Sequence, residues 1–306
     1  YWQKLLGPDA FAKDQLPSMT KFIEIPAHFS GDGYATYRLR IVLDQPLQGP
    51  MAFKMPEFET AYALYVNGRL IGENGVVGRT PAAMRPQWLP KVVDFSTERE
   101  QVEVILQISN FYHKKGGAGQ LIYFGPESLV REAREKALSY ELFLFGNLFV
   151  MGLYHIALFA LRSQDKSPLY FGASCLLVAL RILVTGEHCL VGWFPDISWR
   201  LVVQLNYLSF ALTVPIFVMF TRELFTQGIP LSFVWGLQGG SLAFAGLILL
   251  TPPRVFTDAL QSYQGFVLIA VIYFVFLLIR VAWLGHGGDK PSNDIAIFLI
   301  GVLVLL

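Results

Sequence analysis

Residues 145–188 read FGNLFVMGLYHIALFALRSQDKSPLYFGASCLLVALRILVTGEH, two apolar runs joined by a short charged loop. A helix needs about 20 mostly apolar residues to cross the hydrocarbon core of a bilayer. The first run reaches that length together with the residues just before Phe145, and the second run reaches it by itself. The loop between them carries Arg162, Asp165 and Lys166, which are costly to bury in lipid. The stretch therefore predicts a helical hairpin that crosses a membrane twice.

Further apolar runs follow this hairpin along the chain. A mean soluble helix has only about 11–12 residues, so a succession of much longer apolar helices indicates lipid as the solvent. A last run starts near Asp294 and reaches Leu306, which is too short to span, so we expect a truncated sixth helix and a seventh beyond it. The five complete predicted spans are 137–161, 168–191, 200–220, 231–251 and 256–284.

Charge divides the chain into two parts. Over all 306 residues, 54% are hydrophobic and 15% are charged, whereas soluble domains average about 25% charged residues. Residues 1–137 hold 16 Lys or Arg and 15 Asp or Glu, against 8 and 8 in residues 138–306. The first part therefore has the composition of a water-exposed domain. The net charge of +1 and the lack of a basic run disfavour nucleic acid as a partner.

The positive charges of the short loops predict the orientation in the membrane, because Lys and Arg concentrate on the cytoplasmic side. Five of them lie in the loops after the first, third and fifth spans, and two lie in the opposite loops. This bias places the N-terminal domain outside the cytoplasm. The lack of cysteine in that domain fits a Gram-negative periplasm or a thiol-poor cell surface, so we expect the bundle in the bacterial inner (cell) membrane. The five are Arg162, Lys166, Arg222, Arg280 and Lys290, and the two are Arg200 and Arg254.

Several polar side chains lie within the predicted spans. Such residues are costly in lipid and usually face the interior of a bundle, so we expect an intramembrane polar network that includes an Arg181–Glu141 pair. Three roles remain open for it: helix packing, a ligand pocket or switch, and an ion or substrate pathway. The predicted members are Glu141, Asn147, His155, Arg181, Gln204 and Asn206.

Residues 20–125 carry the signals of short β-strands. The stretch ATYRLRIVL at 35–43 alternates apolar and polar residues, and so does QVEVILQISNF at 101–111. Asn67-Gly68 separates two apolar alternating runs and suits a type I′ hairpin turn, in which both residues need a positive φ. Many short strands with turn signals between them predict a β-sandwich.

The order of these pieces resembles the jelly-roll, galactose-binding-like domain that serves as the sugar-binding module of β-galactosidases and β-glucuronidases. The matching motifs are IPAHF at 25–29, GDGYATYRLRI at 31–41, ALYVNGRLIGENGVVGRTP at 63–81 and VEVILQISNF at 102–111. The resemblance implies a ligand, carbohydrate among the candidates, held by the loops beyond the strands. In the alternative, Trp88 anchors a loop, Asn110 caps a strand end and His113 is a solvated surface residue. The candidate ligand residues are Asn74, Arg79, Arg85, Trp88, Asn110, Tyr112 and His113.

Residues from about 138 to the end resemble the bacterial seven-transmembrane receptors with diverse intracellular signalling modules. The pattern is carried by Gly146, Met151, Leu153-Tyr154, Leu158-Phe159, Arg162, Asp165, Leu169-Tyr170-Phe171, Leu180-Arg181 and Gly186. The resemblance implies a sensor with an extracytoplasmic domain, seven helices and a cytoplasmic kinase, nucleotide cyclase or phosphatase as output.

We therefore predict a membrane protein of three parts: an extracytoplasmic β-sandwich at 1–126, a juxtamembrane helical linker at 127–137 and a transmembrane bundle at 138–306. The function that we expect is a sensory receptor, and the alternative is a transporter or channel with an outer lid domain. Nucleophile-elbow, HExxH, CxxC and P-loop patterns are absent from the sequence, so we expect no catalytic residue, metal or cofactor. The expected partners are the lipid bilayer and a small-molecule or carbohydrate ligand, with a homodimer left open.

Overall fold

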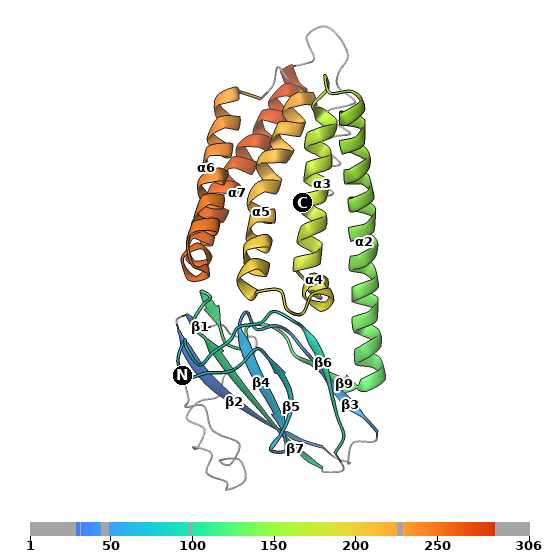
Figure 1. Cartoon of the computed structure of the whole chain (residues 1–306), viewed down its shortest axis with the longest axis vertical. Helices are drawn as coiled ribbons and strands as arrows, with labels where there is room; N and C mark the ends of the chain where they lie inside the picture. The colour runs from blue at the N-terminus through green and yellow to red at the C-terminus, as the bar shows by residue number, and fades with distance from the viewer. Residues whose placement is uncertain (1–28, 31, 44–48, 98–99, 225–228, 285–306) are drawn as a thin grey trace. The chain divides into compact units, whose positions relative to one another are not determined.

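The computed structural model describes residues 29–30, 32–43, 49–97, 100–224 and 229–284 (Figure 1). The motif at 25–28 and the sixth predicted span lie outside these residues. The chain divides into two compact units, which are treated separately below. Unit 1 comprises residues 1–145, 182–206 and 252–257, and unit 2 comprises residues 146–181, 207–251 and 258–306.

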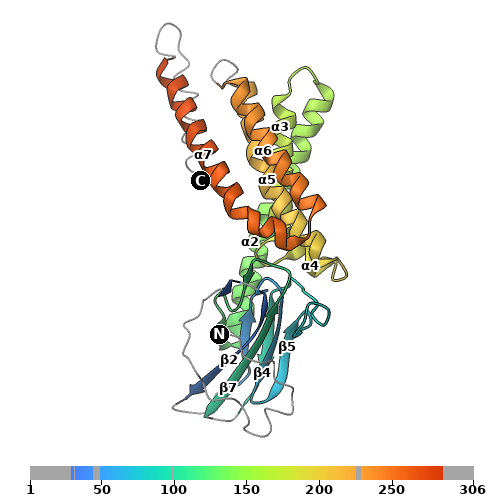
Figure 2. The same ribbon diagram turned by 90° about the vertical axis from the view of Figure 1, so that its left-hand side faces the viewer.

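Among the described residues of unit 1, nine strands form three antiparallel sheets. One sheet has the order β2-β7-β4-β5, a second has the order β6-β3-β9, and β1 pairs with β8 (Figure 2). The strands are β1 (Phe29–Ser30), β2 (Gly33–Val42), β3 (Met51–Met55), β4 (Ala61–Val66), β5 (Arg69–Asn74), β6 (Lys91–Phe95), β7 (Gln101–Asn110), β8 (Lys115–Gly116) and β9 (Tyr123–Pro126).

The two larger sheets pack face to face. Alternate residues of β3 and β7, such as Phe53 and Leu106, belong to one buried apolar cluster. Phe53 also stacks on Phe95 of β6, with ring centroids 5.3 Å apart. The alternation read from the sequence thus becomes the inner face of a sandwich. The predicted β-sandwich is confirmed, whereas its galactose-binding-like identity stays a prediction.

The turn between β4 and β5 is the one that the sequence predicts. Asn67 has a φ of 50° and Gly68 a φ of 80°, as a type I′ turn requires. The Asn67 side chain also accepts a hydrogen bond from the backbone N–H of Glu103, at 3.0 Å. The turn is therefore tied to the neighbouring strand β7.

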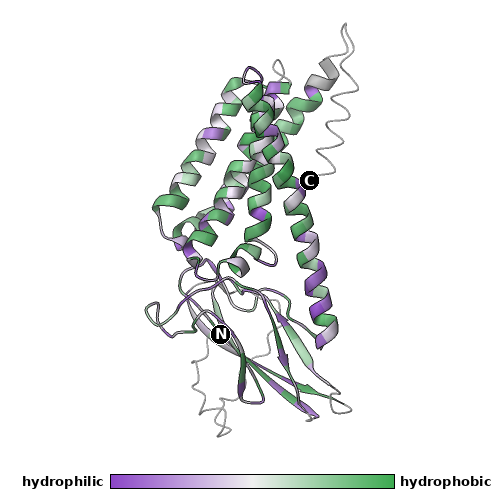
Figure 3. Cartoon of the chain, turned by 45° about the vertical axis from the view of Figure 1, so that its right-hand side comes forward, coloured by the Kyte–Doolittle hydropathy of each residue, from purple (hydrophilic) through white to green (hydrophobic). Residues whose placement is uncertain are grey.

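Five of the six described helices are long and apolar enough to cross a membrane, which confirms the five predicted spans. Figure 3 shows that hydrophobic residues dominate them. The predicted linker and the first span form one continuous helix, α2. The helices are α2 (Glu127–Leu161), α3 (Ser167–Val184), α4 (Cys189–Trp193), α5 (Trp199–Leu224), α6 (Leu231–Leu250) and α7 (Pro253–Leu284).

The second span is shorter than the sequence predicts. We expected it to reach Val191, but α3 ends at Val184 and the five-residue helix α4 follows. Gly186 and His188 adopt left-handed φ values of 63° and 51°, which no continuous right-handed helix contains. The apolar run therefore breaks at residues 185–188 and changes direction there.

Polar side chains connect the helices of unit 2. The Tyr263 hydroxyl of α7 donates to the carbonyl oxygen of Ala211 on α5 at 2.9 Å and lies 2.9 Å from Ser241 Oγ on α6. The guanidinium carbon of Arg181 lies 5.3 Å from the Phe210 ring centroid, a cation–π geometry. His155 Nδ1 lies 2.9 Å from the carbonyl oxygen of Met151 on its own helix.

Candidate functional site

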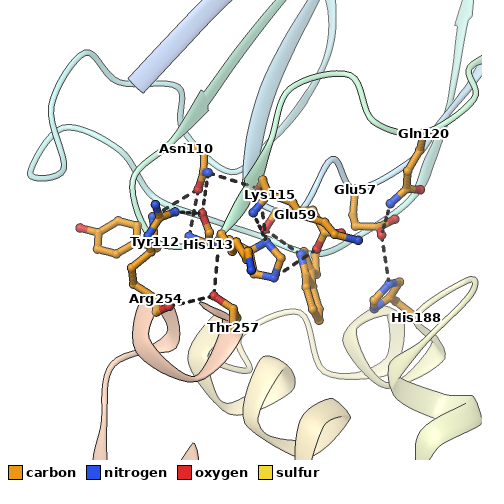
Figure 4. A network of polar contacts seen from close by, with 12 residues as sticks. Glu57, Glu59, Asn110, Tyr112, His113, Lys115, Gln120, His188, Arg254 and Thr257 are labelled. Atoms are coloured by element: carbon orange, nitrogen blue, oxygen red, sulfur yellow. Dashed lines mark hydrogen bonds and ion pairs between the residues drawn. The ribbon is translucent and has the colours of Figure 1, made fainter. Parts of the chain in front are cut away.

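A cluster of polar and charged residues lies in unit 1 where loops of the sandwich meet the α3–α5 connection and the first turn of α7 (Figure 4). We call this cluster the polar junction. His113 and His188 are buried, and Glu57 and Glu59 are half-buried. Ionisable side chains removed from water in this way are unusual unless they are paired, which makes the cluster a candidate functional site. The polar junction consists of Glu57, Glu59, Asn110, His113, Lys115, Gln120, His188, Arg254 and Thr257.

Asn110 organises one side of the polar junction. It is fully buried at the end of β7, and its Nδ2 donates to the carbonyl oxygens of His113 at 2.7 Å and Lys115 at 3.2 Å. Its Oδ1 accepts from the backbone N–H of His113 at 3.0 Å. The side chain therefore holds the loop after β7 in a closed turn, which is the strand-capping role weighed in the sequence.

The same loop contacts the start of α7. Arg254 Nη1 donates to the carbonyl oxygen of His113 at 2.5 Å, and the backbone N–H of Lys114 donates to Thr257 Oγ1 at 3.2 Å. The His113 side chain is itself buried, and its Nε2 lies 3.7 Å from Glu59 Oε2. His113 is therefore an interior residue and not the solvated one that the sequence left open.

Glu59 is the most perturbed acid of the polar junction. Burial raises the pKa of Glu59 to about 7, the nearby Glu57 carboxylate raises it as well, and Lys115 opposes both. Phe58 and Glu59 have φ values of 47° and 66°, and such values are strained for residues other than glycine. Both features fit a functional position, although nothing in the sequence around Glu59 marks it.

His188 closes the other side of the polar junction. Its side chain is 5% exposed, and its Nε2 lies 4.0 Å from Glu57 Oε1, which also accepts from Gln120 Nε2 at 2.6 Å. Burial lowers the pKa of His188, while Glu57 and Glu187 act in the opposite direction. Its Nδ1 has no hydrogen-bond partner among the residues that the structure describes. We therefore expect a neutral imidazole at pH 7.

Trp88 contacts residues on both sides of the polar junction. Its side chain is buried, and its Nε1 donates to the carbonyl oxygen of Glu59 at 2.8 Å. Three rings surround it, those of His188, His113 and Trp199, with centroids 5.4, 6.2 and 6.2 Å away. The indole therefore acts as the loop anchor weighed in the sequence.

A second charged group fixes the turn after α3. The Glu187 side chain is only 6% exposed and forms ion pairs with Lys54 of β3 and Arg134 of α2. The backbone N–H of Glu187 donates to both carboxylate oxygens of Glu141, at 3.2 and 3.1 Å. We call Glu187, Lys54, Arg134 and Glu141 the Glu187 clasp. It joins the sandwich, the first long helix and the α3–α4 turn within unit 1.

Gly186 lets the Glu187 clasp close. A Cβ atom at this position would collide with the Glu141 carboxylate, and the left-handed φ disfavours any side chain. We expect Gly186→Ala to lower the stability of unit 1 by about 1–2 kcal/mol, the usual penalty for a left-handed L-residue. Thermal unfolding of the purified protein in detergent measures this. Gly192→Ala is the control, because a Cβ there meets nothing within 4 Å, and equal losses would contradict the argument.

A cavity of about 540 Å³ lies next to Trp88. Its walls come from the sandwich segments 75–76 and 85–88 and from residues 191, 195–199 and 202. Arg85 reaches it from the sandwich, and Asp196 reaches it from the α4–α5 connection. This volume falls within the range of about 300–1,000 Å³ that ligand pockets occupy.

The structure distributes the predicted ligand residues unevenly. Arg85 and Trp88 line the cavity. Asn74 is buried, and its Nδ2 donates to the carbonyl oxygen of Gln87 at 2.9 Å. Arg79 is exposed, and the Tyr112 hydroxyl donates to the carbonyl oxygen of Pro81 at 2.8 Å. The ligand roles of these residues stay predictions.

The predicted members of the intramembrane network also lie in different surroundings. Glu141 belongs to the Glu187 clasp of unit 1, and Arg181 belongs to unit 2, so their pairing stays a prediction. Asn147 is exposed on α2, whereas Gln204 and Asn206 are half-buried on α5.

Sequence reasoning missed Glu57, Glu59, Glu187 and His188. The available signal was Glu187-His188 directly after Gly186, two polar residues that interrupt an apolar run.

Comparison with known proteins gives a family match. A family model described as 7TM diverse intracellular signalling matches residues 138–306, which is more than half of the chain. No curated protein matches the chain.

Proposed function

Because the chain belongs to the 7TM diverse intracellular signalling family, we propose that it is a transmembrane sensory receptor whose sandwich detects an extracytoplasmic ligand. The family is one of multi-pass membrane proteins with a signalling role. In this proposal, ligand binding shifts the balance between two packings of unit 1, and the helices pass the change to the cytoplasmic side. A ligand can do this only if it binds the two packings with different affinity.

The Glu187 clasp is the observation that carries the proposal. Lys54 belongs to a strand of the sandwich, Arg134 and Glu141 belong to α2, and Glu187 lies in the turn between α3 and α4. A shift of β3 therefore acts on α2 and α3 through ion pairs and not through a flexible linker. The continuous helix α2 supports the stiff connection that this requires.

Contacts within unit 1 support the proposed location of the sandwich outside the cytoplasm. The sandwich contacts His188 on the α3–α5 connection and Arg254 in the first turn of α7, which directly follows the α6–α7 connection. Both connections lie on the side with fewer positive charges, the predicted outer side. We propose the bacterial inner membrane as the site of the bundle and the periplasm or cell surface as the site of the sandwich.

The experiment is hydrogen–deuterium exchange on the full chain in lipid nanodiscs, with wild type compared with Lys54→Met. Loss of the Lys54 ammonium leaves Glu187 with one cation and loosens the Glu187 clasp. We expect faster exchange not only near residues 185–190 but also at residues 162–170, at the other ends of α2 and α3.

Lys136→Met is the matched control, because Lys136 forms an exposed pair with Glu132 on the same helix α2. Faster exchange confined to residues 185–190 in Lys54→Met would reduce the Glu187 clasp to a local anchor and overturn the coupling. Solute flux through the protein in liposomes would favour the transporter alternative instead.

The carbohydrate ligand expected from the jelly-roll resemblance is a separate proposal. Trp88, its predicted stacking surface, is 4% exposed, so the structure offers a sugar little of that indole face. A panel of mono- and disaccharides at millimolar concentration, added to the protein in nanodiscs, tests it by thermal shift. No shift with any saccharide would remove the carbohydrate version and leave the receptor.

A further inference from the structure

The cavity beside Trp88 contains one cation and one anion that have no ion-pair partner. Arg85 and Asp196 both line it and both are exposed. Within the described ranges neither side chain makes a hydrogen bond or an ion pair, including one with the other. The cavity therefore presents a positive group from the sandwich and a negative group from the α4–α5 connection.

A third polar group of the cavity also lacks a partner. Trp199 Nε1 is buried, and among the described residues nothing accepts a hydrogen bond from it. A buried donor without an acceptor costs about 1–3 kcal/mol, so such groups call for an explanation. Trp199 lines the cavity, so a small movement of its ring toward the cavity would let an acceptor oxygen on a bound molecule satisfy Nε1.

The rest of the lining includes the polar residues Gln87 and Ser198, and most of its other side chains are apolar. It combines branched and cyclic side chains from both walls, which suit an apolar group of a ligand and not a ring of hydroxyls. These side chains are those of Val76, Pro86, Val191, Pro195, Ile197 and Val202.

From these features, and on the premise of the receptor proposed above, we infer that the cavity binds a small zwitterion of the α-amino-acid class with an apolar side chain. Arg85 binds the carboxylate, for which its guanidinium fork is suited. Trp199 Nε1 donates to a carboxylate oxygen, and Asp196 binds the ammonium group. The apolar lining receives the side chain. A saccharide would leave the opposite charges of Arg85 and Asp196 without charged partners.

The position of Trp88 connects this site with the polar junction. Trp88 lines the cavity, donates to the carbonyl oxygen of Glu59 and lies against the His188 ring. A ligand that displaces or tightens Trp88 therefore acts on Glu59 and His188. His188 is the direct neighbour of Glu187, so the site adjoins the Glu187 clasp.

The test is calorimetric titration of the full chain in nanodiscs with L-phenylalanine and L-leucine. Two half-ligands accompany them: 3-phenylpropionate, which lacks the ammonium group, and 2-phenylethylamine, which lacks the carboxylate. We expect both amino acids to bind, and Arg85→Gln and Asp196→Asn each to raise their Kd about tenfold or more. Of the two half-ligands, Arg85→Gln should weaken the binding of 3-phenylpropionate only, and Asp196→Asn should weaken the binding of 2-phenylethylamine only.

Matched controls come from strand β5, whose residues Arg69 and Glu73 are exposed and do not line the cavity. Arg69→Gln and Glu73→Gln should leave every Kd unchanged. Trp199→Phe keeps an aromatic ring but removes the donor, and it should weaken both amino acids and 3-phenylpropionate. A melting profile of each variant shows that it is folded.

Several results would overturn the inference. These are no heat of binding with either amino acid to the folded wild type, or equal affinity in wild type, Arg85→Gln and Asp196→Asn. Binding of D-galactose that both variants weaken would make the cavity a saccharide site and overturn the zwitterion.

Amino-acid binding without an exchange change at residues 162–170 would support the ligand site and contradict the receptor. A coupling response to Lys54→Met without any binding would do the reverse.

Discussion

Glu187→Gln is expected to lower the stability of unit 1 by about 2–3 kcal/mol. Removing one partner of a buried ion pair costs about 3–5 kcal/mol, because the other charge is left uncompensated. Lys54 and Arg134 keep 24% and 35% of their side-chain exposure, so water recovers part of this loss. The measurement is thermal unfolding in detergent, followed by intrinsic tryptophan fluorescence, to which Trp88 and Trp199 contribute among the six tryptophans of the chain.

The control for this prediction is Glu132→Gln on α2. The Glu132 carboxylate pairs with Lys136 at 2.6 Å, and the two side chains are 55% and 76% exposed. Such surface pairs contribute about 0–1 kcal/mol, so we expect almost no change in the melting midpoint. If the two variants melted alike, burial of Glu187 would add nothing to its ion pairs, and the Glu187 clasp would lose its structural role.

The elements that the sequence predicts correctly are those set by local properties. A span depends on the apolar content of about 20 consecutive residues, and a type I′ turn depends on two, here Asn67 and Gly68. The alternation that predicts the sandwich likewise repeats every two residues. The family resemblance from residue 138 onward rests on a continuous stretch, and the family match covers that same region.

The elements that the sequence does not predict depend on distant residues or on backbone conformation. The sequence predicts that the second span reaches Val191, but α3 ends at Val184, just before the left-handed φ of Gly186. Lys54 and Glu187 are 133 positions apart, and neither lies in a recognisable pattern. Residues predicted as ligand contacts, such as Asn110 and His113, instead hold a loop together. A polar residue after a strand thus has two roles that only the surrounding fold separates.

Glu59→Gln is expected to stabilise unit 1 at pH 8 and to have little effect at pH 4. The pKa of Glu59 is raised from 4.5 to about 7 in the folded protein. The folded state therefore holds this proton more tightly than the unfolded state, and stability is lost as the pH rises from about 4.5 through about 7. This rise in the pKa of Glu59 corresponds to a loss on the order of 3 kcal/mol at alkaline pH. Glutamine resembles the protonated acid at every pH and avoids that loss.

His188 contributes in the opposite direction. Burial lowers the pKa of His188, so the unfolded state binds a proton first, and stability is lost as the pH falls below about 6.5. Subtracting the wild-type melting profile from that of Glu59→Gln removes this contribution, because both proteins contain His188. The groups that face Glu59 are Glu57, His113 and Lys115. These groups are also present in both wild type and Glu59→Gln.

The measurement is the melting midpoint of both proteins from pH 4 to pH 8.5, with Glu135→Gln as the control. Glu135 is exposed on α2, so its neutralisation should shift the midpoint equally at every pH. For Glu59→Gln the difference from wild type should be near zero at pH 4, grow between pH 4.5 and 7, and level off above that. A difference that is constant across the range would mean that folding leaves the pKa of Glu59 unchanged. In that case the polar junction would not change its charge near neutral pH.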